Sequence, residues 1–227
     1  MKTIKNQLVK SIAVLSLMIF ITANVQAQKV IEFGVRYMPT ISSFDVKTSS
    51  GGTIKGEATL GYGAGAFLGV NFTKHLGVQV EVIYTSLNQK YTDQNVSREI
   101  NLKYINIPLL LSFNTDKSAP VNLNIVAGPQ IGLSTGSSIK SSGGDGTITS
   151  QAVLSVKKND LGIAYGLGVD FGLNPGKTFR LGLGYRGVLG LVDISDNSET
   201  TTTDQFYVVS KTHIKTNAGY IGISFIF

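Results

Sequence analysis

The sequence predicts an all-β fold, an eight-stranded antiparallel up-and-down β-barrel, from three observations. Eight segments alternate apolar and polar residues with a period of two, the period of a strand. The connections between them run long, short, long, short, long, short, long, as expected when both ends of a barrel lie on one side. The chain ends on an aromatic residue, Phe227, within the last of these segments.

The first segment of the chain reads as a secretory signal peptide, residues 1–27. Three lysines precede an apolar run at residues 12–21, and residues 25–27 form a small-residue cleavage pattern. The run is short for a transmembrane helix, which needs about 20 apolar residues. We therefore expect cleavage, and one domain from residue 28 to residue 227, because no linker or composition break divides that stretch.

Composition excludes several classes of function. The chain has no cysteine, so neither a lipid anchor at the cleavage site nor a disulfide is possible. Without the three lysines of the signal segment, 17 basic and 14 acidic residues remain, a net charge of +3. Because these charges are scattered, we expect no nucleic acid partner, which would require a clustered basic face.

The first four strands are expected at about residues 29–41, 58–71, 75–87 and 100–113. Their alternate apolar positions run from 31 to 37, 60 to 70, 76 to 84 and 105 to 113. The opposite face of the second segment is mostly glycine. In the fourth segment, Pro108 removes a donor from the sheet, and a closed barrel has no edge where proline is normally tolerated. We therefore expect a bulge or a local break in strand pairing near Pro108.

The last four strands are expected at about residues 121–133, 160–173, 178–190 and 213–227. Their alternate apolar positions run from 121 to 133, 161 to 173, 179 to 185 and 221 to 227. The sixth strand gives the clearest pattern, because every residue of its other face is Gly, Ala or Asp.

The lengths of the connections predict which end of the barrel lies on each side of the membrane. Short turns are expected at residues 72–74, 114–120 and 174–177, on the periplasmic side. Long loops, rich in Ser, Thr, Gly and Asp and with few apolar anchors, are expected outside at residues 42–57, 88–99, 134–159 and 191–212. They serve either as a recognition surface or as padding, and the sequence does not separate the two.

The polar face of the strands is predicted to line the barrel interior. An eight-stranded lumen is only wide enough for side chains, and glycine takes little room there. The apolar face carries bulky side chains suited to lipid, where an arginine would cost about 2–4 kcal/mol at the midplane. A polar lumen network, structural in role, is therefore expected from Glu32, Arg36, Glu81, Asp160, Asp170, Arg180 and Arg186. The alternative is a soluble lipocalin-like barrel that binds an apolar ligand.

Three motifs give the chain a family resemblance: residues 104–111 (Tyr-Ile-Asn-Ile-Pro-Leu-Leu-Leu), residues 127–129 (Ala-Gly-Pro), and Asp160-Leu-Gly162 followed by residues 166–171 (Gly-Leu-Gly-Val-Asp-Phe). The chain resembles, from about residue 29 to residue 227, the PorT-type outer-membrane β-barrel family of Bacteroidota. The resemblance implies a transmembrane barrel in the outer membrane of a Gram-negative bacterium. It implies no catalytic residues. The founding member is implicated in protein secretion and gliding, so the resemblance implies a secretion-associated role.

No site for catalysis, cofactor or metal is predicted. The Gly-x-Gly-x-x-Gly at Gly182 lies inside a strand, whereas a dinucleotide site needs it between a strand and a helix. The two histidines, His75 and His213, are expected at opposite membrane faces, which argues against a shared metal or catalytic site. A lipid-acting enzyme using His213 and Ser210 is the least favoured alternative.

The sequence is thus interpreted as a non-enzymatic outer-membrane barrel with a plugged lumen. Its role is structural, or it binds partners or serves an envelope complex through its extracellular loops. The expected partners are outer-membrane lipid, the barrel assembly machinery through the C-terminal strand, and an envelope protein.

Overall fold

The computed structural model describes residues 30–43, 46–47, 53–54, 57–93, 96–142, 148–152, 157–192, 194 and 214–227. The predicted signal segment therefore lies outside the described residues. Eight long strands build the barrel: β1 (Val30–Ser43), β4 (Glu57–Asn71), β5 (Leu76–Asp93), β6 (Val96–Asn114), β7 (Val121–Ser142), β9 (Asn159–Gly172), β10 (Phe179–Gly190) and β11 (Lys215–Ile226). No helix within the described ranges is long and apolar enough to cross a membrane.

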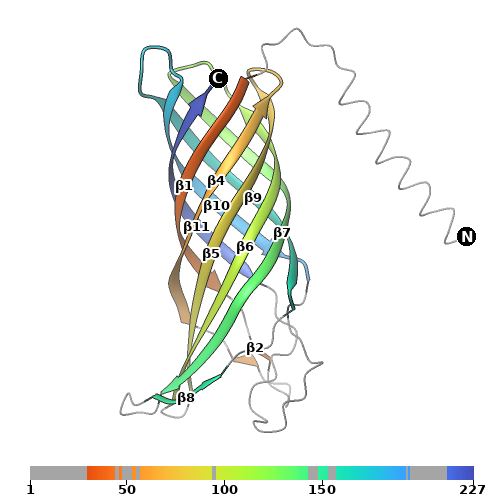
Figure 1. Ribbon diagram of the computed structural model, residues 1–227, viewed down its shortest axis with the longest axis vertical. Helices are drawn as coiled ribbons and strands as arrows, with labels where there is room; N and C mark the ends of the chain where they lie inside the picture. The colour runs from red at the N-terminus through yellow and green to blue at the C-terminus, as the bar shows by residue number, and fades with distance from the viewer. Residues whose placement is uncertain are drawn as a thin grey trace, which may run out of the picture.

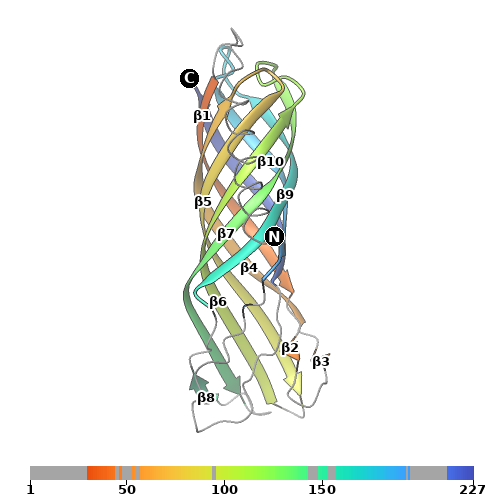
Figure 2. The same ribbon diagram turned by 90° about the vertical axis from the view of Figure 1, so that its right-hand side faces the viewer.

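The eight strands form one closed antiparallel sheet (Figures 1 and 2). Each strand pairs with its neighbours in chain order, and β1 pairs with β11 to close the ring. The fold class and all eight strands predicted from the sequence are confirmed. The start of β1, the end of β11 and the short turns lie at one end of the barrel (Figure 1), as the alternation of connection lengths predicted.

One wall of the barrel is taller than predicted. Residues 88–99 were expected to be a loop, but β5 continues to Asp93 and β6 begins at Val96. The expected loop 134–159 is also partly strand, because β7 continues to Ser142 and β8 (Ile148–Ala152) pairs with it. This extension protrudes at the end opposite the short turns (Figures 1 and 2). A two-residue ladder, β2 (Val46–Lys47) with β3 (Thr53–Ile54), lies within the expected loop 42–57.

A row of alternating charges crosses the outer face of this extension. The strand registers pair Glu57 with Lys90, Lys90 with Glu99, and Glu99 with Lys140, and all four side chains are exposed. Opposite charges that face each other across strands stabilise a sheet by about 0.2–1 kcal/mol per pair. The sequence does not predict this sheet, because its strands are polar on the outer face and do not show the alternation of a lipid-facing strand.

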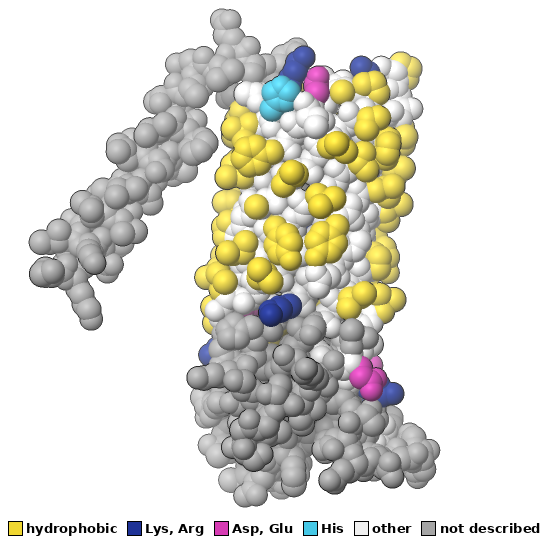
Figure 3. Space-filling view, turned by 180° about the vertical axis from the view of Figure 1, so that it is seen from behind, with side chains coloured by type: hydrophobic (Ala, Val, Ile, Leu, Met, Phe, Trp, Pro, Cys, Tyr) yellow, Lys and Arg dark blue, Asp and Glu magenta, His cyan; other side chains and the backbone are white. Residues whose placement is uncertain are grey.

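The polarity of the barrel matches the prediction. The large apolar side chains of the barrel strands point outward, and many are more than a third exposed, as Leu167 (61%) and Ile125 (63%) illustrate. They cover the wall as a band, and the charged side chains lie near its two ends (Figure 3). Most inward positions of the barrel wall are polar or glycine, and the buried apolar side chains include two small clusters, one around Met38 and one around Leu110.

Three strand prolines each interrupt one ladder. The β5–β6 ladder has no paired residues at Pro108, between Val80↔Leu109 and Ile83↔Asn106, and its register is the same on both sides. The expected local break is therefore confirmed, without a bulge at that position. Pro129 interrupts β6–β7 and Pro39 interrupts β1–β11 in the same way, while each proline pairs normally on its other side. The reason is that a backbone N–H points to one neighbour only, so its loss affects one ladder.

Candidate functional site

The centre of the lumen is a three-residue ion cluster. Arg36 of β1 and Arg186 of β10 each donate to the same carboxylate oxygen, Glu81 Oε1 of β5, at 2.9 Å. Gln79 donates to that oxygen as well. The Arg36, Glu81 and Arg186 side chains are 7%, 0% and 3% exposed, so the cluster is shielded from water. Because these three strands lie on different sides of the ring, the cluster spans the lumen.

Two aromatic rings fill the space beside this cluster. The Arg36 guanidinium lies 4.1 Å from the Phe67 ring centroid and 4.8 Å from that of Tyr220, which is cation–π geometry. Glycines make the room: a Cβ at Gly34 would lie 2.5 Å from the Phe67 ring, and one at Gly184 would lie 2.6 Å from the Tyr220 ring. These glycines thus leave room on the inner face for the ring of the residue paired with each of them on the neighbouring strand.

A second ion cluster lies at the short-turn end of the lumen, the end predicted to be periplasmic. Lys117, in the turn between β6 and β7, reaches into the lumen and contacts Glu32 Oε2 at 2.8 Å and Asp170 Oδ2 at 3.0 Å. Asn122 and Asn124 also donate to Asp170 Oδ2. Burial alone would lower the pKa of the Lys117 ammonium, but the two carboxylates raise this pKa above its ordinary value. The ammonium is therefore charged when it is buried.

Arg180 is hydrogen-bonded to backbone carbonyl oxygens instead of to side chains. Its guanidinium is fully buried and donates to backbone carbonyl oxygens, among them Lys117 O (3.4 Å) and Ala119 O (3.1 Å) of the β6–β7 turn. It also donates to Lys177 O and Asp170 O. Arg180 therefore binds the periplasmic turns to the wall.

The structure brings six of the seven predicted lumen residues into two clusters and adds one residue. Glu81, Arg36 and Arg186 form the central cluster, while Glu32, Asp170 and Arg180 lie around Lys117. The seven predicted residues carry four negative and three positive charges, and Lys117 supplies the fourth positive charge. Strand alternation could not reveal Lys117, because it lies in a turn. The imbalance of the predicted set was the available signal for a missing cation.

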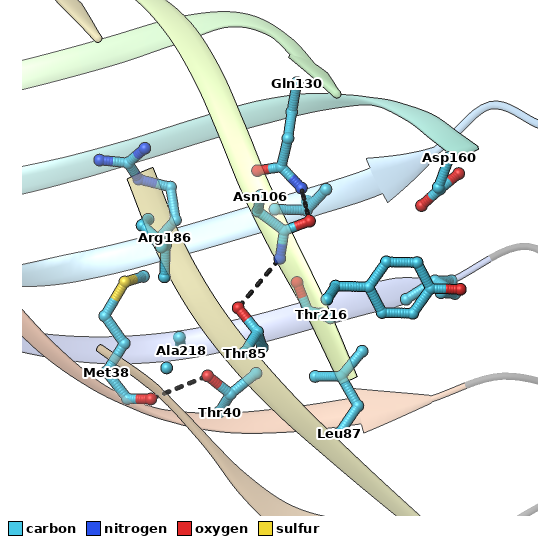
Figure 4. Close-up of a pocket in the computed structure, with 15 residues that line it drawn as sticks. Met38, Thr40, Thr85, Leu87, Asn106, Gln130, Asp160, Arg186, Thr216 and Ala218 are labelled. Carbon is cyan, nitrogen blue, oxygen red and sulfur yellow. Dashed lines mark hydrogen bonds between the residues drawn. The ribbon is translucent and has the colours of Figure 1, made fainter. Parts of the chain in front are cut away.

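Asp160 lies apart from both clusters, at the wall of a small cavity in the extracellular half of the lumen (Figure 4). The cavity has a volume of about 40 Å³, and Arg186 lies on the opposite side from Asp160. Gln130 donates to Asn106, which donates to Thr85 (Figure 4). A second cavity, of about 20 Å³, lies between the central cluster and the cluster around Lys117. Spaces of this size with polar walls suit a few water molecules.

Large apolar side chains line part of the described extracellular mouth of the lumen, next to the buried Gln89. Leu87, Ile100 and Leu102, on the extension, are 1–4% exposed, and Ile194, just after β10, is 1% exposed. The loops were expected to hold few apolar anchors, and Ile194 is one that was missed. The rest of the expected loop 191–212 lies largely outside the described residues.

The structure also locates the motifs weighed for catalysis. Gly182 of the Gly-x-Gly-x-x-Gly lies inside β10, as expected. The His75 ring is at the short-turn end, where its Nδ1 lies 3.2 Å from Asn114 O. His213 and Ser210 lie outside the described residues. The described part of the chain has no group of three or more His, Asp or Glu side chains placed to hold a metal ion.

Comparison with known proteins gives the same architecture. Residues 26–196 match the sequence model of a family described as outer membrane protein beta-barrel domain. Among solved structures, the outer membrane protein OprG of Pseudomonas aeruginosa has a TM-score of 0.55 at 16% identity, covering 90% of this chain and 99% of that one. The attachment invasion locus protein Ail of Yersinia pestis, in complex with a heparin analogue, has a TM-score of 0.41 at 15% identity, covering 88% and 99%. No curated protein matches the sequence.

Proposed function

This chain belongs to the outer membrane protein beta-barrel domain family, and on that premise we propose that it is a non-enzymatic barrel with a plugged lumen that acts through its extracellular parts. The family implies the outer membrane of a Gram-negative bacterium. We propose further that residues 1–27 are cleaved on export, and that the chain is a PorT-type member from the Bacteroidota. The proposed partners are outer-membrane lipid, the barrel assembly machinery at the C-terminal strand, and an envelope protein.

The observation that supports a plugged lumen is the central cluster. Arg36, Glu81 and Arg186 cross the lumen from three strands and are almost fully buried. The two cavities beside the cluster hold about 40 and 20 Å³, far less than a solute path requires. The soluble alternative has no such support, because it needs an apolar interior and a polar outer surface.

Planar-bilayer recording of the purified protein tests the plug. We expect no stable conductance from the wild-type chain, because two charged layers and a partly apolar mouth lie in series. Stable channels of several nanosiemens would overturn the proposal. For an Arg186→Ala variant we also expect no conductance, because the second ion cluster, around Lys117, would still close the barrel.

The role of the extracellular parts is tested by cross-linking and pull-down from intact cells. The wild-type chain is compared with a chain in which residues 197–208 are replaced by a short Gly-Ser linker, and heat-modifiable gel mobility checks that both are folded. We expect an envelope protein that is captured by the wild type and lost from the variant. Equal capture by both chains would rule out this loop as the binding element.

A secretion-associated role rests on the family resemblance alone, so it is the second candidate. It predicts that the captured partner is a component of an envelope secretion complex. Deletion of the gene would then reduce the amount of exported protein in the medium, and unchanged export would remove this candidate.

A further inference from the structure

The closing seam of the barrel, between β1 and β11, is a discontinuous ladder. Every other pairing in the ring joins strands that follow each other along the described chain. Along the seam, pairs run from Glu32↔Ile226 to Tyr37↔Ile221 and resume at Thr40↔Ala218. The gap falls at Pro39, which has no N–H to donate to β11. The periplasmic part of the seam is therefore a separate paired segment.

That segment carries a buried carboxylate bonded on both sides. Glu32 of β1 points into the lumen and is 3% exposed. The Ser224 hydroxyl of β11 donates to Glu32 Oε1 across the seam at 2.8 Å. The Lys117 ammonium contacts Glu32 Oε2 at 2.8 Å. Both oxygens of this seam carboxylate are thus engaged, one by the strand that closes the ring and one by a distant turn.

Lys117 reaches the seam from the far side of the barrel. Its turn joins β6 to β7, and β1 is four strands from β7 in either direction around the ring. The turn is fixed to the rest of the periplasmic end: the Lys117 amide donates to Lys74 O at 3.0 Å, and Arg180 donates to Lys117 O and Ala119 O. The ammonium is further held by Asp170 of β9. The seam is therefore connected to the opposite wall through a turn that is itself hydrogen-bonded to its surroundings.

We propose that Lys117 is a clasp that keeps the periplasmic half of the β1–β11 seam closed. Without its ammonium, the Glu32 carboxylate would be buried with a single hydroxyl partner, which is costly for a charge. Glu32 also lines the 20 Å³ cavity, which has room for one or two water molecules, so full hydration of the carboxylate requires β1 to separate from β11. The part of the ladder on the extracellular side of Pro39, which begins at Thr40↔Ala218, is paired independently and would stay closed. This device concerns the barrel wall and does not depend on a partner for the loops.

Spin labels on the seam test the clasp, because the chain contains no cysteine of its own. One label pair, called the lower pair, replaces Val35 and Ile223, which face each other on the periplasmic side of Pro39. The other, called the upper pair, replaces Ile41 and Asn217, which face each other on its extracellular side. All four side chains point outward, so the labels leave the lumen intact. Dipolar broadening of the spectrum reports whether the two strands are adjacent, in protein reconstituted into phospholipid vesicles.

In the Lys117→Met chain we expect loss of broadening at the lower pair and retention at the upper pair. Lys117→Arg, which keeps the charge, should retain broadening at both. Lys74→Met is the matched control, since it removes an exposed cation from the neighbouring periplasmic turn and should change neither pair.

Two results would overturn the proposal: a folded Lys117→Met chain with an unchanged lower pair, or loss of broadening at both pairs, which would mean general loosening. If Lys117→Met does not fold, Lys117→Gln decides, because it keeps a polar side chain in that space while the Glu32 carboxylate still loses its cation. Partial loss at the lower pair supports the clasp, and an unchanged lower pair rejects it.

Discussion

Neutralising Glu81 is the most direct perturbation of the lumen. In the wild-type chain its carboxylate lies between two buried guanidinium groups, so the cluster carries a net charge of +1. Glu81→Gln keeps the shape and an acceptor oxygen but raises the net charge to +2. Arg36 and Arg186 each contact one oxygen at 2.9 Å, so their nearest nitrogens are at most about 6 Å apart. At an effective dielectric constant of about 20, two unit charges at that distance repel by about 3 kcal/mol.

We therefore expect Glu81→Gln to lower the free energy of unfolding by about 3–5 kcal/mol, the usual cost of removing one partner of a buried ion pair. Arg186→Gln should cost less, about 1.5–3 kcal/mol, because it leaves a neutral Arg36–Glu81 pair and removes a charged hydrogen bond. The double variant Glu81→Gln/Arg186→Gln should cost less than the sum of the two, because it removes one of the repelling charges.

Urea unfolding of the barrel in phospholipid vesicles measures these values, followed by tyrosine emission because the chain has nine Tyr and no Trp. Glu57→Gln is the matched control, since Glu57 is an exposed member of the extracellular charge row and should change stability by less than about 1 kcal/mol. If Glu81→Gln costs no more than Glu57→Gln, the central cluster is hydrated and the reasoning for a plugged lumen is wrong.

Three further predictions use the same unfolding assay. Gly128→Ala should cost several kcal/mol or prevent folding, because its Cβ would lie 2.0 Å from Leu109 O, whereas Gly219→Ala, with its nearest neighbour at 4.0 Å, should be close to neutral; equal effects would contradict the packing argument. Leu167→Arg should cost about 2–4 kcal/mol in a bilayer, and a neutral effect would show that this side chain faces water. Because the pKa of Lys117 is raised in the folded chain, the stability that its ammonium contributes is complete below the unfolded pKa of about 10.4 and is lost as pH rises through the folded pKa. The stability difference between wild type and Lys117→Met should therefore be constant from about pH 7 to about pH 10. A difference that shrinks within that range would contradict the paired, charged state of Lys117.

How far the sequence predicts the site differs between its two clusters. Arg36, Glu81 and Arg186 were predicted to face the lumen because each lies opposite an apolar neighbour in a period-two pattern, and their pairing follows once the barrel closes. Lys117 was missed because alternation gives no direction for a turn residue. Arg180 was expected in the polar lumen network, and it binds turn carbonyl oxygens that only the folded ends of the barrel bring near it.

The sequence by itself determined the strands, their number and the face that each presents outward, because side chains alternate across a strand wherever it lies. It also predicted that Pro108 breaks pairing, since a missing N–H is a property of the residue. The tertiary structure decided which ladder each proline breaks, how far β5, β6 and β7 extend beyond the barrel wall, and that Lys117 reaches Glu32 across the lumen. These features depend on the registers of all eight strands around a closed ring, and a local sequence pattern does not determine how those registers combine.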